Sequence, residues 1–134
     1  MSLFVDTSAL IAFLDEDEGN HERAVATFDE LLRNVELVTH NYVVLEATAL
    51  VHSRWGTRAS RDLLRGVVRS LNVAWVDVDL HDAAVAAFLA ANRRDASLVD
   101  WTSFEFMHRR GLATAFAFDR DFGEQGFETI PAER

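Results

Sequence analysis

The chain of 134 residues contains no cysteine, no lysine and only one proline, Pro131. The lack of cysteine excludes disulfides and thiolate metal sites, which suits a reducing cytoplasm. The lack of lysine excludes a P-loop NTPase, which needs a lysine to reach phosphate, and weighs against a phospho-receiver domain. There is also no signal peptide, flexible linker or apolar run of about 18 residues. We therefore expect one cytoplasmic domain, residues 1–134, with no membrane attachment.

All thirteen basic residues are arginines, and the formal net charge is −9. Such a charge ordinarily argues against a polyanionic partner, because phosphate contacts need basic side chains. The distribution of the arginines qualifies this argument, since helical spacing places Arg58, Arg61, Arg65 and Arg69 in one stripe, with Arg54 nearby in sequence. The stripe is interpreted as a surface for RNA phosphates, as a dock for an acidic partner segment, or as a solvated helix face.

Short apolar runs alternate with helical patterns along the chain. Strands are predicted at 2–5, 35–39, 72–78, 113–118 and 127–130, and helices within 6–17 and at 19–34, 41–51, 57–71, 81–92 and 97–111. Candidate N-caps are Thr7 or Ser8, Asn41 and Ser97, and Gly111 is a candidate C-cap. This alternation predicts a three-layer α/β/α sandwich with a central parallel sheet of four to five strands.

Acidic residues occur where ligands of such a sheet would bind. Asp6 and Asp119 each follow a predicted strand, and ligands of open α/β sheets lie beyond the carboxyl ends of the strands. Asp121 follows Asp119, and Asp100 lies in the first turn of its helix. Glu46 is the one charge in the apolar helix "NYVVLEATALV", where no solvated face is available to it.

Each acid also has a purely structural interpretation. Asp6 could start a turn or cap a helix, and Asp100 could form a capping box with the serine three residues before it. Asp119 and Asp121 could cap a short last helix. Glu46 lies in mid-helix and cannot cap, and an unpaired buried carboxylate costs several kcal/mol, so a buried arginine partner is the main structural alternative.

A divalent cation accounts for these acids together. Converging carboxylates repel one another, whereas a hard cation keeps them ionised and takes oxygen ligands, which favours Mg²⁺ or Mn²⁺ over Zn²⁺. The five histidines show no H-x-x-x-H pair and are interpreted as surface or capping residues. Magnesium sites with few carboxylates commonly act on phosphates, so phosphodiester hydrolysis is the first chemistry to test.

Four segments, in this order and spacing, resemble the PIN-domain ribonucleases and in particular the VapC-type toxins. They are "LFVDTSALIAFL", "VLEATALV", "LVDWTSFEFMHRRG" and "FAFDRDFGEQGFETIP". Each segment is weakly specific, but the resemblance covers nearly the whole chain. It implies an α/β/α sandwich that holds one or two Mg²⁺ or Mn²⁺ ions and cuts RNA endonucleolytically. It also implies a cognate antitoxin as partner and a homodimer.

The resemblance assigns roles to positions of this sequence. The four catalytic and metal-binding acids correspond to Asp6, Glu46, Asp100 and Asp119, and a more variable metal-binding acid corresponds to Asp121. Hydroxyl side chains expected to orient ligands or water correspond to Thr7, Ser8 and Ser103. One departure is Ala117, because many members of the family carry threonine there.

Three alternatives remain open from the sequence. The chain could be a PIN-like module that binds RNA or metal without cleavage, or a PIN nuclease outside any toxin–antitoxin pair. Glycosidase chemistry also uses carboxylates at strand ends, but it needs two acids rather than four and a sugar-stacking aromatic side chain beside them.

Overall fold

Five parallel strands form one sheet in the computed structural model, which describes residues 1–132. The elements are β1 (Ser2–Val5), α1 (Thr7–Leu14), α2 (His21–Asn34), β2 (Glu36–His40), α3 (Asn41–Trp55), α4 (Thr57–Arg65), a 3₁₀ turn (Val67–Ser70), β3 (Asn72–Ala74), α5 (Val78–Ala91), α6 (Leu98–Arg110), β4 (Thr114–Phe116), α7 (Asp121–Glu124) and β5 (Glu128–Ile130). The prediction of a parallel sheet with four to five strands is confirmed.

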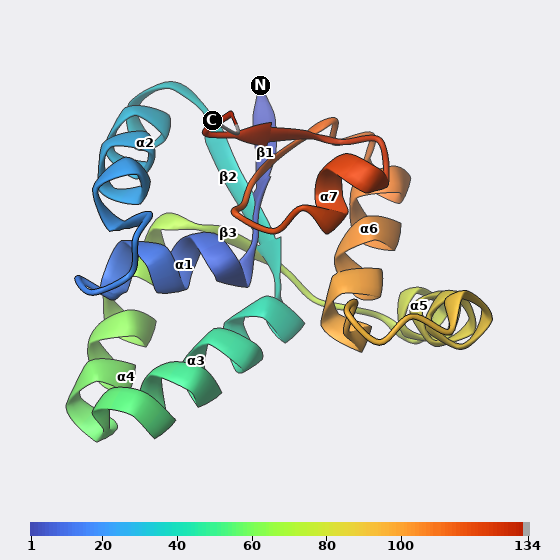
Figure 1. The fold of residues 1–134 in the computed structure, drawn as a ribbon, viewed down its shortest axis with the longest axis horizontal. Coiled ribbons are helices and arrows are strands. Elements are labelled where there is room, and N and C mark those ends of the chain that lie inside the picture. Colours follow the sequence, from blue (N-terminus) through green and yellow to red (C-terminus); the bar gives the residue numbers. More distant parts are fainter. Residues whose placement is uncertain (133–134) are drawn as a thin grey trace.

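The helices cover both faces of the sheet. In Figure 1, α1, α2 and α4 lie on one side of the strands, and α5, α6 and α7 lie on the other. This is the predicted three-layer α/β/α sandwich. Among residues 1–132, no helix is both long and apolar enough to span a membrane.

The strand order β3-β2-β1-β4-β5 places β1 at the centre. Phe4 of β1 is in register with Val38 of β2 on one side and with Ala115 of β4 on the other. The chain first builds the sheet outward from β1 to β3, then crosses back to β4. The point between β1 and β4 is therefore a topological switch point, where α/β sheets leave a crevice at the carboxyl ends of the strands.

The core is built around the central strand. Leu3, Phe4 and Val5 are fully buried, because β1 is covered by helices on both faces. On one face the Phe4 ring lies 6.0 Å from the ring of Phe122, measured between centroids, and Phe122 lies 5.1 Å from Phe104 of α6. These contacts fix α6 and α7 against the end of the sheet that carries the acids.

The predicted helix 57–71 is too long, since α4 ends at Arg65 and a 3₁₀ turn follows Gly66. A side chain could not be placed easily at residue 66, because a Cβ there would lie only 2.8 Å from the Asp62 carbonyl oxygen. Glycine and the two valines after it also have low helix propensity. The arginine stripe is thus divided, with Arg69 in the 3₁₀ turn.

Three other predictions differ in detail. The strand predicted at 72–78 ends at Ala74, because Asp77 caps α5 through a 2.8 Å bond from the Leu80 N–H. The N-caps of α1 and α3 are Asp6 and His40, the residues just before those predicted. The helical spacing of Val85, Phe88 and Leu89 predicts that all three face the core, but Leu89 is 69% exposed because α5 packs mainly against α6 and buries only a narrow stripe.

Gly111 should be required where α6 ends. Its φ of 67° lies in the left-handed region, and the carbonyl of Met107 accepts the N–H of the next residue, Leu112. We expect Gly111→Ala to lower the free energy of unfolding by about 1 kcal/mol, because alanine is strained at this φ. Chemical denaturation measures this change, with Gly123→Ala in α7 as the control. An equal effect of both substitutions would contradict the argument.

Candidate active site

Four acids predicted from the sequence line one cavity at the carboxyl edge of the sheet. The cavity has a volume of about 470 Å³, and we call it the acid cavity. Its walls include Asp6, Glu46, Asp100 and Asp119, which come from four separate segments. In Figure 1 the start of α1, the first turns of α3 and the lower end of α6 lie near the lower ends of β1 and β2.

Ser8 joins the two strand ends that flank the switch point. Its hydroxyl donates a 2.6 Å hydrogen bond to Oδ2 of Asp6 and accepts a 3.0 Å bond from the N–H of Phe118. The Ser8 N–H also donates to Asp6 Oδ2 at 3.1 Å, which is the N-cap bond of α1. The predicted contact of Ser8 with an acid is therefore present, and it also holds the loop that carries Asp119.

Asp100 and Asp119 are each fixed through one carboxylate oxygen. Oδ2 of Asp100 accepts the Ser97 N–H at 2.8 Å, and the Ser97 hydroxyl accepts the Asp100 N–H at 3.1 Å, which completes the capping box. Oδ1 of Asp119 accepts the Asp121 N–H at 2.9 Å. Among residues 1–132, the second oxygen of each carboxylate, like Oδ1 of Asp6, has no hydrogen-bond donor. The structural bonds thus leave one oxygen of each aspartate for a ligand.

Glu46 is half-buried, which corrects the expectation that it is fully buried. It lies in the second turn of α3 and lines the acid cavity. Among the described residues it forms no salt bridge and no hydrogen bond, so the arginine partner considered as an alternative is absent there. Its carboxylate is free to accept a proton or to bind a cation.

The acids perturb one another, as expected for converging carboxylates. Burial raises the pKa of Asp6 from 3.8 to about 7, and the charges of Asp100 and Asp119 add to the rise, although hydrogen bonds from Ser8 oppose it. Burial raises the pKa of Asp100 to about 6, with contributions from Asp119 and Glu46. Without a cation, burial and the neighbouring charges therefore favour a proton on Asp6 up to about neutral pH.

Asp121 does not line the acid cavity itself, and its role as a metal ligand stays a prediction. One of its oxygens lies within 4.8 Å of oxygens of Asp100 and Asp119, but its Oδ1 accepts a 3.0 Å hydrogen bond from Nη2 of Arg93. The same Nη2 bonds to Asp95 at 2.8 Å and to Glu124 at 3.0 Å. Asp121 is thus paired with the Arg93 guanidinium, and this ion pair connects the loop before α6 with α7.

The ligand atoms available in the cavity fit a hard divalent cation. The walls offer carboxylate oxygens, and none of the described wall residues is a histidine. Thr7 also lines this cavity, and its hydroxyl oxygen is buried and has no hydrogen-bond partner among the described residues. A buried hydroxyl without a partner is costly, so an ion-bound water or a ligand oxygen is a suitable partner for it.

Ser103 does not line the acid cavity, and its hydroxyl contacts groups behind it. Its hydroxyl donates to the Val99 carbonyl at 3.0 Å and accepts a 2.9 Å bond from Nε2 of His40. Nδ1 of His40 accepts the N–H of Val43 at 3.3 Å, so the ring proton lies on Nε2, and burial lowers the pKa of His40 to about 3. Ser103 therefore connects α6 with the start of α3, the helices that carry Asp100 and Glu46.

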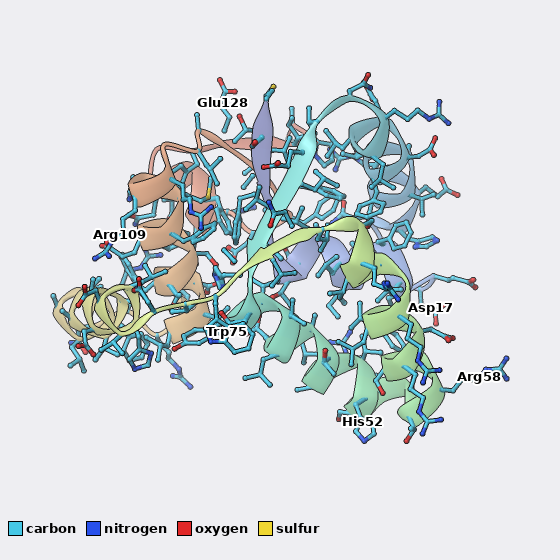
Figure 2. All side chains as sticks on the ribbon, turned by 180° about the vertical axis from the view of Figure 1, so that it is seen from behind. Asp17, His52, Arg58, Trp75, Arg109 and Glu128 are labelled. Atoms are coloured by element: carbon cyan, nitrogen blue, oxygen red, sulfur yellow. The ribbon has the colours of Figure 1, made fainter. Side chains whose placement is uncertain are left out.

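The arginines predicted to bind RNA or a partner protein differ in where they lie relative to the acid cavity. Arg54 lines the acid cavity and lies 3.7 Å from Asp15. The stripe residues are exposed and line no wall of the acid cavity, and Figure 2 shows the Arg58 side chain extending away from the molecule. A role of the stripe in RNA or partner binding therefore stays a prediction. Its members are Arg58, Arg61, Arg65 and Arg69.

Sequence reasoning missed three residues near the acids. Glu18 lines the acid cavity but is not among the acids predicted from the sequence. His40 caps α3, as the capping interpretation allowed, but it is buried among aromatic rings, and nothing in its sequence spacing indicated this. No sequence pattern distinguishes Arg93 from the other arginines as an ion-pair centre, because its three acidic partners come together only in the folded chain.

Sequence and structure comparisons match almost the whole chain to PIN-domain proteins. A sequence profile of the PIN domain matches residues 3–128. The chain is 31% identical over 134 residues to the 23S rRNA-specific endonuclease VapC20 of Mycobacterium tuberculosis, covering 98% of this chain and 99% of that protein. The crystal structure of VapC20, described as a Sarcin-Ricin loop cleaving toxin, superposes with a TM-score of 0.83 at 30% identity, covering 93% of this chain and 95% of that chain.

A more distant structure shares the fold alone. The VapBC2 complex from Rickettsia felis, bound to a DNA fragment from its promoter, matches with a TM-score of 0.72 at 9% identity. The match covers 96% of this chain and 97% of that chain.

The raised pKa of Asp6 predicts how stability depends on pH. Between about pH 4 and pH 7 the folded chain holds a proton at Asp6 that the unfolded chain releases, so without metal the free energy of unfolding should fall as pH rises through this window. Mg²⁺ or Mn²⁺ should raise Tm more at about pH 8 than at about pH 5, because protons compete with the ion. Thermal melts with chelator or metal measure both effects.

Asp6→Asn is the matched control, because the amide keeps an oxygen acceptor for Ser8 but cannot ionise. In chelator, this variant should show a flatter dependence of Tm on pH than the natural chain. Identical pH profiles of the two proteins would show that Asp6 is not the titrating group.

Proposed function

Because the chain belongs to the PIN-domain family, we propose that it is a metal-dependent endoribonuclease and the toxin of a toxin–antitoxin pair. Residues 1–134 then form one PIN domain. The observation that carries the proposal is the acid cavity, in which Asp6, Glu46, Asp100 and Asp119 meet. A module that only binds RNA has no need for such a cluster, because carboxylates repel phosphate and destabilise one another.

Three aspartates would hold Mg²⁺ or Mn²⁺. Asp6, Asp100 and Asp119 each keep one carboxylate oxygen without a donor among residues 1–132, and each is oriented through its other oxygen. Such fixed single oxygens suit an ion that keeps some of its water. When bound, the ion would supply a water of lowered pKa and neutralise charge on the phosphate.

Glu46 is the proposed proton acceptor. It lines the same cavity but has no hydrogen bond or salt bridge among the described residues, in contrast to the three aspartates. A carboxylate within reach of the attacking water can remove its proton as the phosphorus–oxygen bond forms. Thr7 and Ser8 would position water and the Asp6 carboxylate, respectively, which is consistent with the unpartnered Thr7 hydroxyl and the 2.6 Å bond from Ser8.

The proposed substrate is the Sarcin-Ricin loop of 23S rRNA. Support comes from VapC20, an endonuclease specific for 23S rRNA, which is 31% identical to this chain over almost the full length of both proteins. We propose a cognate antitoxin as the protein partner, because VapC20 is described as a toxin. The exposed arginine stripe would offer a dock for an acidic segment of such a partner.

Asp6→Asn should abolish RNA cleavage. We expect ribosomes incubated with the natural chain and Mn²⁺ to show one new 5′ end in 23S rRNA by primer extension, and the variant to lose on the order of 10³-fold or more in rate. Circular dichroism checks that the fold is retained. Cleavage by the variant at the natural rate would refute the assignment, and cutting elsewhere in the RNA would refute only the substrate.

We further propose a homodimer formed through an exposed apolar face. Trp75 and Val78 are 81% and 73% exposed, and Leu45 of α3 is 70% exposed. The segments that carry them are joined by a 2.6 Å hydrogen bond from the Val76 N–H to the Asn41 side chain. Large apolar side chains exposed together are typical of protein interfaces.

Trp75→Glu should therefore shift the protein from dimer to monomer. A charge introduced into an apolar interface loses its hydration without gaining a partner, which opposes association. Light scattering coupled to gel filtration measures the mass. Leu89→Glu is the control, because Leu89 is 69% exposed at the other end of α5. A dimer of unchanged stability in the Trp75 variant would place the interface elsewhere.

A further inference from the structure

A second cavity lies directly beside the acid cavity. It has a volume of about 250 Å³ and shares Asn20, Phe118 and Asp119 with the acid cavity. Its remaining walls include Arg23 of α2, Arg120 in the loop before α7, and Thr129 of β5. We call it the basic cavity, because two guanidinium groups lie in its wall and Asp119 is its only described acid.

Arg23 is held in place by neutral groups. Its Nη1 donates to the Asn20 side-chain oxygen at 3.3 Å, and its Nη2 donates to the Ala132 carbonyl. Its guanidinium carbon lies 5.8 Å from the centroid of the Phe118 ring. These contacts orient the guanidinium but use only two of its five N–H donors, and none of the described partners neutralises its charge.

Arg120 is the second cation of this cavity. It is exposed, and among residues 1–132 its side chain forms no hydrogen bond or salt bridge. Its neighbours in sequence have other partners, since the Asp119 carboxylate accepts the Asp121 N–H and Asp121 binds Arg93. Arg120 therefore brings an uncompensated positive charge to within one residue of a proposed metal ligand.

The charges of the two cavities are complementary to the charges of an RNA strand at a cleavage site. In the acid cavity a bound cation would meet the phosphate that is cut, but the next phosphate along the strand would face the surrounding carboxylates. Arg54, the one arginine among the described walls of the acid cavity, lies 3.7 Å from Asp15. Arginine binds phosphate through paired, charge-assisted hydrogen bonds. The side-chain amide of Asn20 and the hydroxyl of Thr129 add neutral polar groups to the same cavity.

We infer that the basic cavity binds the backbone phosphate next to the phosphate that is cut, through Arg23 and Arg120. This inference rests on the proposed nuclease function and specifies how its substrate is held. It also explains how a chain of net charge −9 retains RNA at an acidic site. The cations that matter are then those beside the cavity, and the arginine stripe on α4 lies apart from it.

Binding of a short fluorescein-labelled single-stranded RNA tests the inference. Fluorescence anisotropy is measured with Ca²⁺ in place of Mg²⁺, so that a hard cation is present while cleavage is slow. We expect Arg120→Gln to raise Kd about tenfold, the effect of losing a charge-assisted hydrogen bond. The slope of log Kd against log salt should fall by about 0.7, the value for one phosphate contact on a single strand.

Arg23→Gln should have the same effect, but it also loses contacts that order the protein, so Arg120→Gln is the decisive variant. The matched control is Arg110→Gln, at the far end of α6 from Asp100, which should leave both Kd and the salt slope unchanged. Calorimetric titration with Mn²⁺ should show that Arg120→Gln does not weaken metal binding. A purely structural role of Arg120 would not alter the salt slope while sparing metal binding.

The outcomes separate this inference from the proposed function. If the natural chain cuts RNA but Arg120→Gln binds RNA as the natural chain does, the phosphate site is wrong and the nuclease stands. An equal loss in Arg110→Gln would show that only total charge matters, which also overturns the site. If RNA binding depends on Arg120 but the natural chain does not cut with Mn²⁺, the phosphate site stands and the nuclease proposal fails.

Discussion

The burial and mutual repulsion of carboxylates in the acid cavity are the constraint on which the rest of this structure depends. Burial raises the pKa of Asp6 to about 7 and that of Asp100 to about 6, and neighbouring carboxylates add to both rises, so without a cation the cavity is held at a cost in stability. The parallel sheet makes this arrangement possible, because the carboxyl ends of β1 and β4 meet at a switch point. A cation relieves the repulsion, so the same feature that destabilises the chain without metal favours binding of the ion proposed for catalysis.

Structural and functional uses of the aspartates are compatible because a carboxylate has two oxygens. Asp6 caps α1, Asp100 completes a capping box, and Asp119 accepts a backbone N–H, each through one oxygen. The capping interpretations drawn from the sequence were therefore correct for Asp6 and Asp100, yet they did not exclude a metal site. Fixing one oxygen orients the other, which prepares the cavity for an ion with little rearrangement.

Charge on this protein is organised locally, against a net charge that is strongly negative. Arg93 binds three acids at once, Asp95, Asp121 and Glu124. Arg23 and Arg120 instead lie in the wall of a neighbouring cavity and have no acidic partner among residues 1–132. The two environments account for the difference between an arginine that stabilises the fold and one that is available to phosphate.

The sequence by itself determined the order of strands and helices, the parallel sheet and the four acids of the cavity, because apolar periodicity and strand-end positions are local signals. Only the tertiary structure decided which charges meet. Glu18 joins the cavity, Asp121 is paired with Arg93, and the arginine stripe lies elsewhere. These pairings join residues far apart in the chain, and no local pattern encodes the distance between two side chains that folding brings together.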